Sequence, residues 1–247
     1  QTCALPISME RDIIHTKDGS ATLASQEFKE TYHSVNGALT ETSHIFINNG
    51  IARYLELNAK TNNKREVVNI FEVGFGTGLN CLATAHYNIG LQGLNINYNS
   101  IEKFPLSIGK TRELNHLELF PLQFREIAAG IYDAPWNIPV EIFPGFNLNK
   151  LEGDLIHILK KGFPMLEGNK ADVVYFDAFS PGVQPELWQP DIFKEIYHMM
   201  GDGAVLVTYS AKGVVKSALR DSGFEVSRVQ GPPGKRHILV ANKKRKD

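Results

Sequence analysis

Three acidic residues stand where predicted strands end, which is where an open α/β sheet binds its ligands. Glu72 precedes the stretch Gly74-Phe75-Gly76-Thr77-Gly78, Glu102 comes 24 positions after Gly78, and Asp177 follows a buried apolar run. An ionised carboxylate accepts hydrogen bonds from ribose hydroxyls or attracts a cation, and it is badly matched to a phosphate. The three acids therefore predict a ligand with hydroxyls and positive charge. The structural alternatives are a surface role for Glu102 and a turn cap for Asp177.

The glycines belong to a predicted strand, turn and helix. Residues 67–73 form a mostly apolar, β-branched run that is typical of a buried parallel strand, and an apolar helical pattern follows from residue 79. Glycines suit the turn between them because it is tight and because a ligand must approach bare backbone. The spacing is GxGxG, not the GxGxxG of dinucleotide-binding proteins. A turn that binds nothing is the alternative.

Two later stretches also place polar groups at strand ends. Gly153-Asp154 follows a strand pattern, and its carboxylate is expected either to accept from an adenine amino group or to cap the next helix. Phe104-Pro105 ends the strand of Glu102 and offers an aromatic face to an adenine. The apolar run at 172–176 opens into residues 177–182, next to the glycine loop in a doubly wound sheet. Chemistry is therefore expected where the two loops meet.

Composition limits the possible functions. The formal net charge of -1 gives no overall attraction to nucleic acid, so a polyanionic partner must meet a local basic patch. Two cysteines, Cys3 and Cys81, predict neither a disulfide framework nor a metal site. No stretch approaches the ~18 apolar residues of a membrane span, so we expect a cytoplasmic protein with no membrane partner. Residues 1–8 lack the basic start of a signal peptide, and Met9 fits a natural start better than Gln1.

The elements that position these groups are expected to form one α/β domain with an N-terminal extension. In residues 1–65 we predict a hairpin turning at Asp18-Gly19, helices over 39–46 and 51–58, and a polar linker over 61–65. This extension is expected to cap the carboxyl edge of the sheet. Residues 66–247 would form the main domain, with seven strands, five of them parallel and the last two an antiparallel hairpin. The predicted strands are 67–73, 94–101, 140–151 in two pieces, 172–176, 204–209, 224–229 and 236–241, and the helices are 106–114, 121–132, 155–161, 191–200 and 212–222.

Several stretches together resemble one known family. FEVGFGTGLN at 71–80 is similar to the first motif of class I S-adenosylmethionine (SAM) methyltransferases. With the stretches below, it resembles the tRNA 5-methylaminomethyl-2-thiouridine methyltransferases, MnmD-type enzymes equivalent to the methylating half of bifunctional MnmC. The resemblance implies a Rossmann-like class I fold and SAM as cofactor, and no counterpart of the FAD-dependent oxidase half is expected. The other stretches are YHSVNGALTET at 32–42, IEKFPL at 101–106, EGDL at 152–155, DAFSPGVQPELW at 177–188 and GPPGKRHIL at 231–239.

The resemblance also implies roles for individual residues. The substrate would be the wobble uridine in the anticodon arm of tRNA, and Asp177 would be the catalytic residue that orients the aminomethyl nitrogen and helps remove its proton. An ordinary Asp pKa near ~3.9 makes a poor base, which favours positioning as its larger role. The cofactor-binding residues would be Glu72, Gly74, Gly76, Gly78, Asn80, Glu102, Lys103, Phe104, Asp154 and Leu155. The substrate-binding residues would be Tyr32, Ser34, Phe179, Ser180, Lys235 and Arg236, with Phe179 stacking on the uracil and the two basic residues, like Lys212 and Lys216, contacting phosphates.

Some alternatives remain open at this point. Tyr32 and Trp188 fit core packing as well as recognition. A polyamine aminopropyltransferase uses decarboxylated SAM on a similar fold, and other amines are possible methyl acceptors. A SAM-fold binding protein without turnover is a third possibility. The sequence does not predict the oligomeric state.

Overall fold

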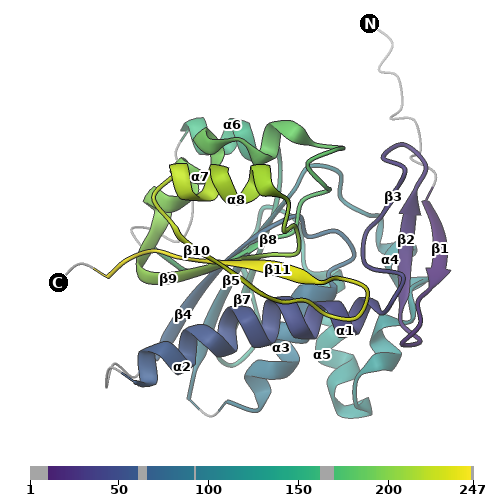
Figure 1. Cartoon of the computed structure of the whole chain (residues 1–247). Coiled ribbons are helices and arrows are strands. Elements are labelled where there is room, and N and C mark those ends of the chain that lie inside the picture. The colour runs from purple at the N-terminus through teal and green to yellow at the C-terminus, as the bar shows by residue number, and fades with distance from the viewer. Residues whose placement is uncertain (1–10, 61–65, 92, 162–169, 246–247) are drawn as a thin grey trace, which may run out of the picture.

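The computed structural model describes residues 11–60, 66–91, 93–161 and 170–245, and its centre is a sheet of eight strands in the order β10-β11-β9-β8-β4-β5-β7-β6 (Figure 1). Three strands run antiparallel to their neighbours and five run parallel to one another, which confirms the predicted fold class and C-terminal hairpin. The antiparallel strands are β6 (Val140–Phe143), β10 (Glu225–Gln230) and β11 (His237–Asn242). The parallel strands are β4 (Val67–Val73), β5 (Asn95–Glu102), β7 (Phe146–Glu152), β8 (Ala171–Phe176) and β9 (Met200–Thr208).

The predicted count of seven strands was wrong by one. Residues 140–151 were counted as a single interrupted strand, whereas β6 and β7 pair with each other as an antiparallel hairpin. The turn between them is Pro144-Gly145, and Gly145 has a φ of 90°, which only glycine adopts readily. The interruption of the strand pattern at Pro144-Gly145 therefore marks a reversal of chain direction.

The topology leaves a crevice above β4 and β8. From β4 the chain adds β5 and then β7 on one side, and it returns to place β8 and then β9 on the other side. The chain continues from β4 to α3 on one face of the sheet and from β8 to α7 on the other face, and the point between two such strands is the usual ligand position in these sheets. Backbone hydrogen bonds hold both loops at their starts, from Gly74 N to Ile101 O and from Asp177 N to Val73 O, each 2.9 Å long.

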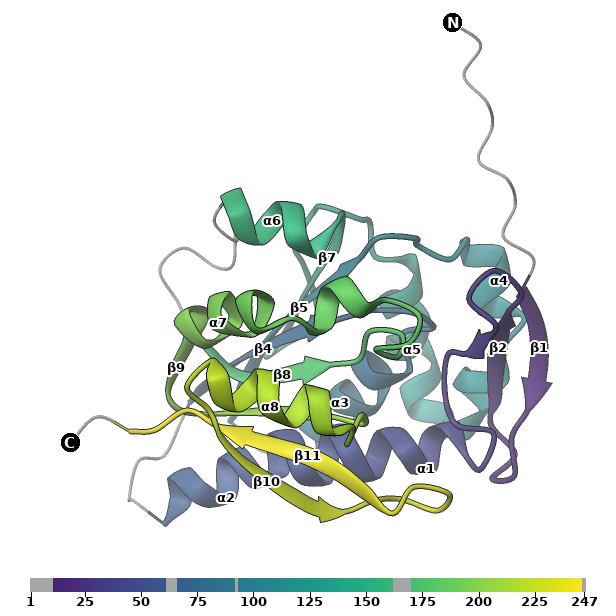
Figure 2. The ribbon, with the colours of Figure 1, turned by 45° about the horizontal axis from the view of Figure 1, so that its top comes forward.

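Helices cover both faces of the sheet and enclose two apolar cores (Figure 2). Each helix buries one apolar stripe; in α7, for example, Ile192, Phe193 and Ile196 are buried. One face carries α1 (Ala38–Thr42), the π-helix η1 (Ser43–Ala52), α2 (Arg53–Ala59), α3 (Leu79–Ile89) and α5 (Leu122–Asp133). The other carries α6 (Leu155–Lys161), α7 (Pro190–Met199) and α8 (Gly213–Asp221). The remaining short helices are α4 (Ile108–Arg112) and the 3-10 turns η2 (Asn115–Leu119) and η3 (Pro185–Trp188).

The two helices predicted at 39–46 and 51–58 are one continuous helical segment, so that prediction needs correction. Asn48-Asn49-Gly50 suggested a break, but these residues lie inside η1, where the helix widens into a π-helix. Gly50 packs directly on the sheet, because a Cβ at this position would lie 2.8 Å from the ring of Tyr175. Glycine here permits close helix-to-sheet packing and does not end the helix.

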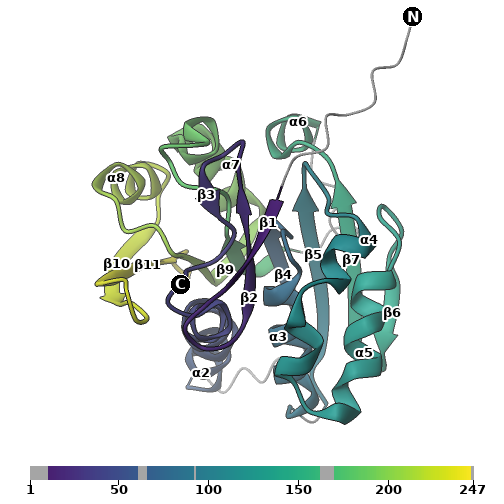
Figure 3. The same ribbon diagram turned by 90° about the vertical axis from the view of Figure 1, so that its right-hand side faces the viewer.

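The N-terminal extension forms a small sheet of its own at one end of the main sheet (Figures 1 and 3). Strands β1 (Arg11–His15) and β2 (Ala21–Ser25) form the predicted hairpin about Asp18-Gly19, and β3 (Glu30–Thr31) adds a third strand that was not predicted. The predictions for Cys3, Met9, residues 1–8 and the linker at 61–65 fall outside the described residues.

Candidate active site

A cavity of about 480 Å³ lies where the carboxyl ends of the parallel strands meet the N-terminal extension. Its walls come from four strand-end loops, from residues 30–36 and from the turn before β11. Acids outnumber bases on these walls, which favours a positively charged ligand. The acidic residues are Glu30, Glu41, Glu102, Asp154, Asp177 and Glu186, and the lysines are Lys103 and Lys235.

The glycine loop lies directly against the loop of Asp177. Gly74 has a φ of 88°, and a Cβ at this residue would lie 2.6 Å from the backbone oxygen of Asp177. Any other residue would force the two loops apart. Gly74 and Gly76 line the cavity, whereas Gly78 lies behind it as the left-handed residue before α3. The loop thus presents bare backbone to the cavity, as the sequence predicted.

Glu102 links the glycine loop to the end of β5. Its Oε2 accepts a hydrogen bond from Gly76 N at 2.9 Å, and its Oε1 accepts from Phe104 N at 2.8 Å. Each carboxylate oxygen retains a further lone pair for a ligand hydroxyl. The side chain lines the cavity together with Lys103 and Phe104. The ribose-binding role of Glu102 stays a prediction, and its carboxylate lies in the cavity as that prediction requires.

Asp154 fills the helix-capping role, one of the two alternatives left open by the sequence. Its Oδ1 accepts from Ile156 N at 2.9 Å at the start of α6, so the carboxylate does cap the helix. Its Oδ2 pairs with Lys103 Nζ at 2.7 Å, and this exposed lysine together with hydrogen bonding lowers the pKa of Asp154. Asp154 and Leu155 both line the cavity, where they remain available to an adenine.

The Asp177 carboxylate faces the cavity from the end of β8. Its Oδ2 accepts a hydrogen bond from Asn80 Nδ2 at 2.8 Å, and Asn80 is itself held by Thr42, whose hydroxyl donates to Asn80 Oδ1 at 2.8 Å. Burial raises the pKa of Asp177 to about 7, and Glu41 adds to this while Asn80 and Lys235 oppose it. The prediction that Asp177 is a poor base therefore needs correction. Its pKa suits proton transfer at neutral pH.

Glu72 does not line the cavity, unlike the other predicted cofactor-binding acids. It is fully buried under the glycine loop, where its Oε2 accepts a hydrogen bond from Ser100 Oγ at 2.7 Å. Its Oε1 has no hydrogen-bond partner among the described residues. Burial raises the pKa of Glu72 to about 8, so the group is mostly protonated at neutral pH. Asn80 is likewise buried and reaches the cavity only through Asp177.

Hydrogen bonds hold residues 30–36 against the loops that line the cavity. Glu30 accepts hydrogen bonds from both the backbone and the hydroxyl of Ser180. His33 Nε2 lies 2.7 Å from Thr77 Oγ1 in the glycine loop. Tyr32 and Phe179 pack edge to face with ring centroids 5.1 Å apart, and both line the cavity, as does Ser34.

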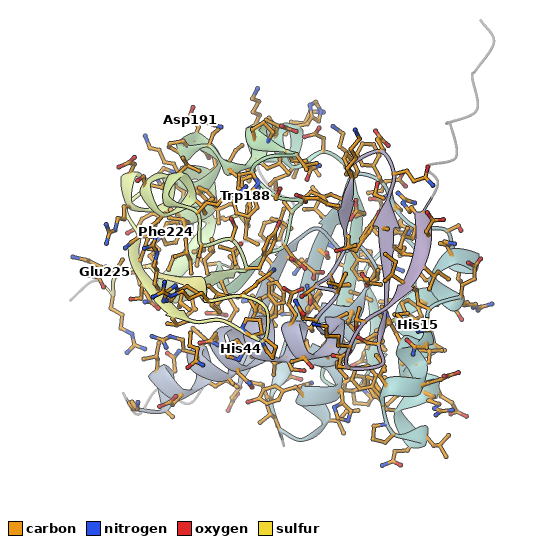
Figure 4. All side chains as sticks on the ribbon, turned by 45° about the vertical axis from the view of Figure 1, so that its right-hand side comes forward. His15, His44, Trp188, Asp191, Phe224 and Glu225 are labelled. Atoms are coloured by element: carbon orange, nitrogen blue, oxygen red, sulfur yellow. The ribbon has the colours of Figure 1, made fainter. Side chains whose placement is uncertain are left out.

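Trp188 is a core residue rather than a recognition residue. It is buried against Phe176 and Phe193 and lies inside the fold (Figure 4). Its Nε1 donates to Phe179 O at 2.8 Å, which supports the loop that carries Asp177.

The turn before β11 brings Lys235 into the cavity but leaves Arg236 outside its lining. Lys235 Nζ lies 2.5 Å from Glu41 Oε1 and 4.1 Å from the centroid of the Tyr209 ring. The exposed Lys212, directly before α8, and the half-exposed Lys216 on α8 also lie outside the cavity lining. Sequence reasoning missed Tyr209 and Glu30. The position of Tyr209 directly after β9 could have indicated its place in the site, because strand ends line the cavity. No local pattern in the sequence indicated Glu30.

Two kinds of feature are absent from the part of the chain that the structure describes. It contains no group of three or more His, Cys, Asp or Glu side chains suited to hold a metal ion. Nor does it contain a helix long and apolar enough to cross a membrane.

Comparison with known proteins agrees with the motifs. Residues 146–244 match a family model described as S-adenosyl-L-methionine-dependent methyltransferase. The tRNA 5-methylaminomethyl-2-thiouridine biosynthesis bifunctional protein MnmC of Ralstonia nicotianae is 34% identical over 88% of this chain, and that of Burkholderia multivorans is 32% identical over 89%. The chain spans about a third of the length of these curated relatives.

Solved structures show the same relationship. MnmC2 from Aquifex aeolicus superimposes with a TM-score of 0.76 at 29% identity, covering 98% of this chain and 73% of the other. Spermidine synthase from Thermotoga maritima superimposes with a TM-score of 0.58 at 13% identity over 96% of this chain and 70% of the other, a likeness of fold alone. Over residues 146–244 the chain thus matches the S-adenosyl-L-methionine-dependent methyltransferase family, and over most of its length it is similar to a third of MnmC.

Proposed function

We propose that the protein transfers a methyl group from SAM to the 5-aminomethyl group of (2-thio)uridine at the wobble position of tRNA, giving 5-methylaminomethyl-(2-thio)uridine. The observation that carries this proposal is the carboxylate of Asp177, which has a pKa of about 7 and faces an acid-rich cavity beside the glycine loop. The names of the MnmC relatives supply the substrate. A cytoplasmic location is part of the proposal, since the substrate is a tRNA.

The cavity walls fit SAM, which carries a sulfonium, an ammonium and two ribose hydroxyls. Glu102 would accept from the ribose hydroxyls, and Phe104 and Leu155 would enclose the adenine, with Asp154 at its amino group. Gly74 and Gly76 would let the methionine part approach the backbone. Glu72 would act from below the loop by holding Ser100. When bound, SAM supplies a methyl group whose bond to sulfur breaks with the electron pair remaining on sulfur.

The acceptor nitrogen needs a lone pair, and the amine is protonated in water near neutral pH. Asp177 would accept one proton from this ammonium, and the neutral nitrogen would then form the new N–C bond. The positive charge moves from sulfur to the methylated nitrogen, where the Glu41 carboxylate stabilises it, and Asp177 then releases its proton to solvent. Asn80 keeps the Asp177 carboxylate in place through its hydrogen bond. Alignment of the nitrogen with the methyl group is the second contribution of the site.

The uridine would enter between the N-terminal extension and the loop of Asp177. Phe179 and Tyr32 line this part of the cavity and offer aromatic faces to the flipped base, with Ser34 and Ser180 beside them. Arg236, Lys212 and Lys216 would contact phosphates of the anticodon arm outside the cavity. With a net charge of -1, binding of tRNA is expected to be salt-sensitive and confined to this side of the molecule.

The test is methyl transfer from labelled SAM to tRNA that carries 5-aminomethyl-2-thiouridine, read by nucleoside mass analysis. We expect the wobble nucleoside to gain one methyl group, and Asp177→Asn to abolish the gain while SAM still binds. Tyr87→Phe, a change at a partly buried residue of α3 outside the cavity lining, is the matched control. Putrescine with decarboxylated SAM tests aminopropyl transfer. Product from putrescine but none from tRNA would overturn the proposal.

A further inference from the structure

The ammonium group of Lys235 lies inside a site made for a cation. It forms an ion pair of 2.5 Å with Glu41 Oε1 and lies over the face of the Tyr209 ring, 4.1 Å from its centroid. Asp177 lines the same cavity and is close enough for Lys235 to lower its pKa. Two carboxylates and an aromatic face are the groups that proteins use to bind an ammonium ligand. Here a side chain of the protein itself occupies that place.

The two walls of this site are rigidly held. Glu41 is buried in α1, and its Oε2 accepts a hydrogen bond from Ser34 N at 2.7 Å. The hydroxyl of Tyr209 donates to Ala178 O at 2.9 Å, which fixes the ring beside the loop of Asp177. These contacts do not involve Lys235, so both walls would keep their positions if the lysine left.

Lys235 is the less firmly held component. It lies in the exposed turn between β10 and β11, and 28% of its side chain is exposed, against 7% for Glu41. Glu41 Oε1 has the ion pair but no aligned hydrogen bond from any described residue. The turn itself is seated on the N-terminal extension, where Gly234 packs on the Asn36 side chain.

The acceptor of the proposed reaction is also a primary ammonium on a short methylene arm. It must reach Asp177, and the walls of Glu41 and Tyr209 line the same cavity. Two ammonium groups cannot occupy one site, since like charges repel and each needs the same oxygen. Meanwhile the RNA that carries the acceptor brings phosphates to the exposed turn of Lys235.

We propose that Glu41 and Tyr209 bind the acceptor ammonium, that Lys235 fills their site in the free protein, and that an RNA phosphate draws Lys235 out when the substrate docks. This inference rests on the proposed function and names the residues that select the amine. Lys235 thus links backbone binding to opening of the acceptor site. A free nucleoside has no phosphate for Lys235 and must compete with the lysine, whereas tRNA relieves that competition.

The charged and titratable groups that face this site are Asp177 from the end of β8, Glu41 from α1, Glu30 from β3 and Tyr209 from the end of β9. Burial raises the pKa of Tyr209 well above its ordinary value, and the three acids add to this, so the ring stays neutral. Removing Lys235 removes an influence that lowers the pKa of Asp177, whereas removing the charge of Glu41 removes one that raises it. The two changes therefore shift the pH dependence of turnover in opposite directions.

The experiment compares binding of 5-aminomethyluridine and of substrate tRNA to the full chain, by calorimetry with S-adenosylhomocysteine in place of SAM. We expect Lys235→Ala to bind the nucleoside about fivefold more tightly and tRNA more weakly, and Lys235→Arg to resemble the parent. Glu41→Gln should weaken binding of both ligands. Lys212→Ala, the matched control directly before α8, should weaken tRNA binding and leave nucleoside binding unchanged.

Each outcome has a defined meaning. If the parent methylates tRNA but Lys235→Ala binds the nucleoside with unchanged or lower affinity, the competition does not exist and the inference is wrong. If Glu41→Gln binds the nucleoside as well as the parent does, Glu41 is not the amine ligand. If the parent methylates no tRNA, the proposed function fails, yet the calorimetric comparison still reads out competition for the amine. A shift of the pH–rate profile upward in Lys235→Ala and downward in Glu41→Gln separates an effect at Asp177 from a loss of structure.

Discussion

The buried carboxyl group of Glu72 makes a quantitative prediction about stability. Its pKa is about 8 in the folded protein against 4.5 as the ordinary value. Between these values the folded state holds a proton that the unfolded state has lost, so the free energy of unfolding falls as pH rises. Each unit of difference corresponds to ~1.4 kcal/mol. The protonation of Glu72 contributes its full share to the free energy of unfolding below pH 4.5. That share is reduced by roughly 3 kcal/mol at pH 7, and it is fully lost above pH 8.

Glu72→Gln removes this titration while keeping an oxygen that accepts from Ser100. We expect the variant to be more stable than the parent at pH 7 by roughly 3 kcal/mol, with the advantage disappearing near pH 4. Urea unfolding at pH 4, 7 and 9 measures the difference, and Glu152→Gln at an exposed site is the control. A Glu72→Gln variant whose stability follows the parent at every pH would refute the reasoning. So would a variant that is less stable at pH 9.

Three further predictions concern the cavity. Turnover of the parent should rise with pH through about 7, as Asp177 loses its proton, and Asp177→Asn should show no turnover at any pH. A flat profile in the parent would remove Asp177 as the base. Glu102→Ala should weaken SAM by on the order of 1–3 kcal/mol in calorimetry through lost ribose bonds, and equal affinity would refute that assignment. Gly74→Ala should lower the free energy of unfolding by about 1–3 kcal/mol in urea, because the Cβ of the alanine would collide with Asp177 O. An unchanged urea midpoint would mean that the glycine loop and the Asp177 loop separate freely.

Local sequence patterns correctly predicted those parts of the site that are formed by residues adjacent in the sequence. The glycine loop, the acid at the end of β5 and the helix after Asp154 were all correct in place, because strand, turn and helix signals lie within a few residues. The same signals failed inside η1, where burial of Gly50 against Tyr175 outweighed its tendency to end a helix. The likeness of whole motifs to a known family led to the proposed function, which the spacing of residues alone would not have done.

Contacts between distant parts of the chain were not predictable in this way. Asn80 reaches Asp177 across 97 positions, and Glu30 reaches Ser180 across 150. The pKa of Asp177 depends on burial and on Glu41, neither of which a local pattern contains. Glu72 illustrates the same limit, since its position before the glycines was correct but its side chain points beneath the loop.

The strand order also has a consequence for synthesis of the chain. β11 lies between β9 and β10, although it is made after both, so β10 has no place in the sheet until β11 arrives. Until then the edge of β9, with its buried apolar residues 204–207, stays open to pairing with other chains. A nascent or truncated polypeptide that stops before residue 237 would expose a template for aggregation, and completing the hairpin protects the protein from it.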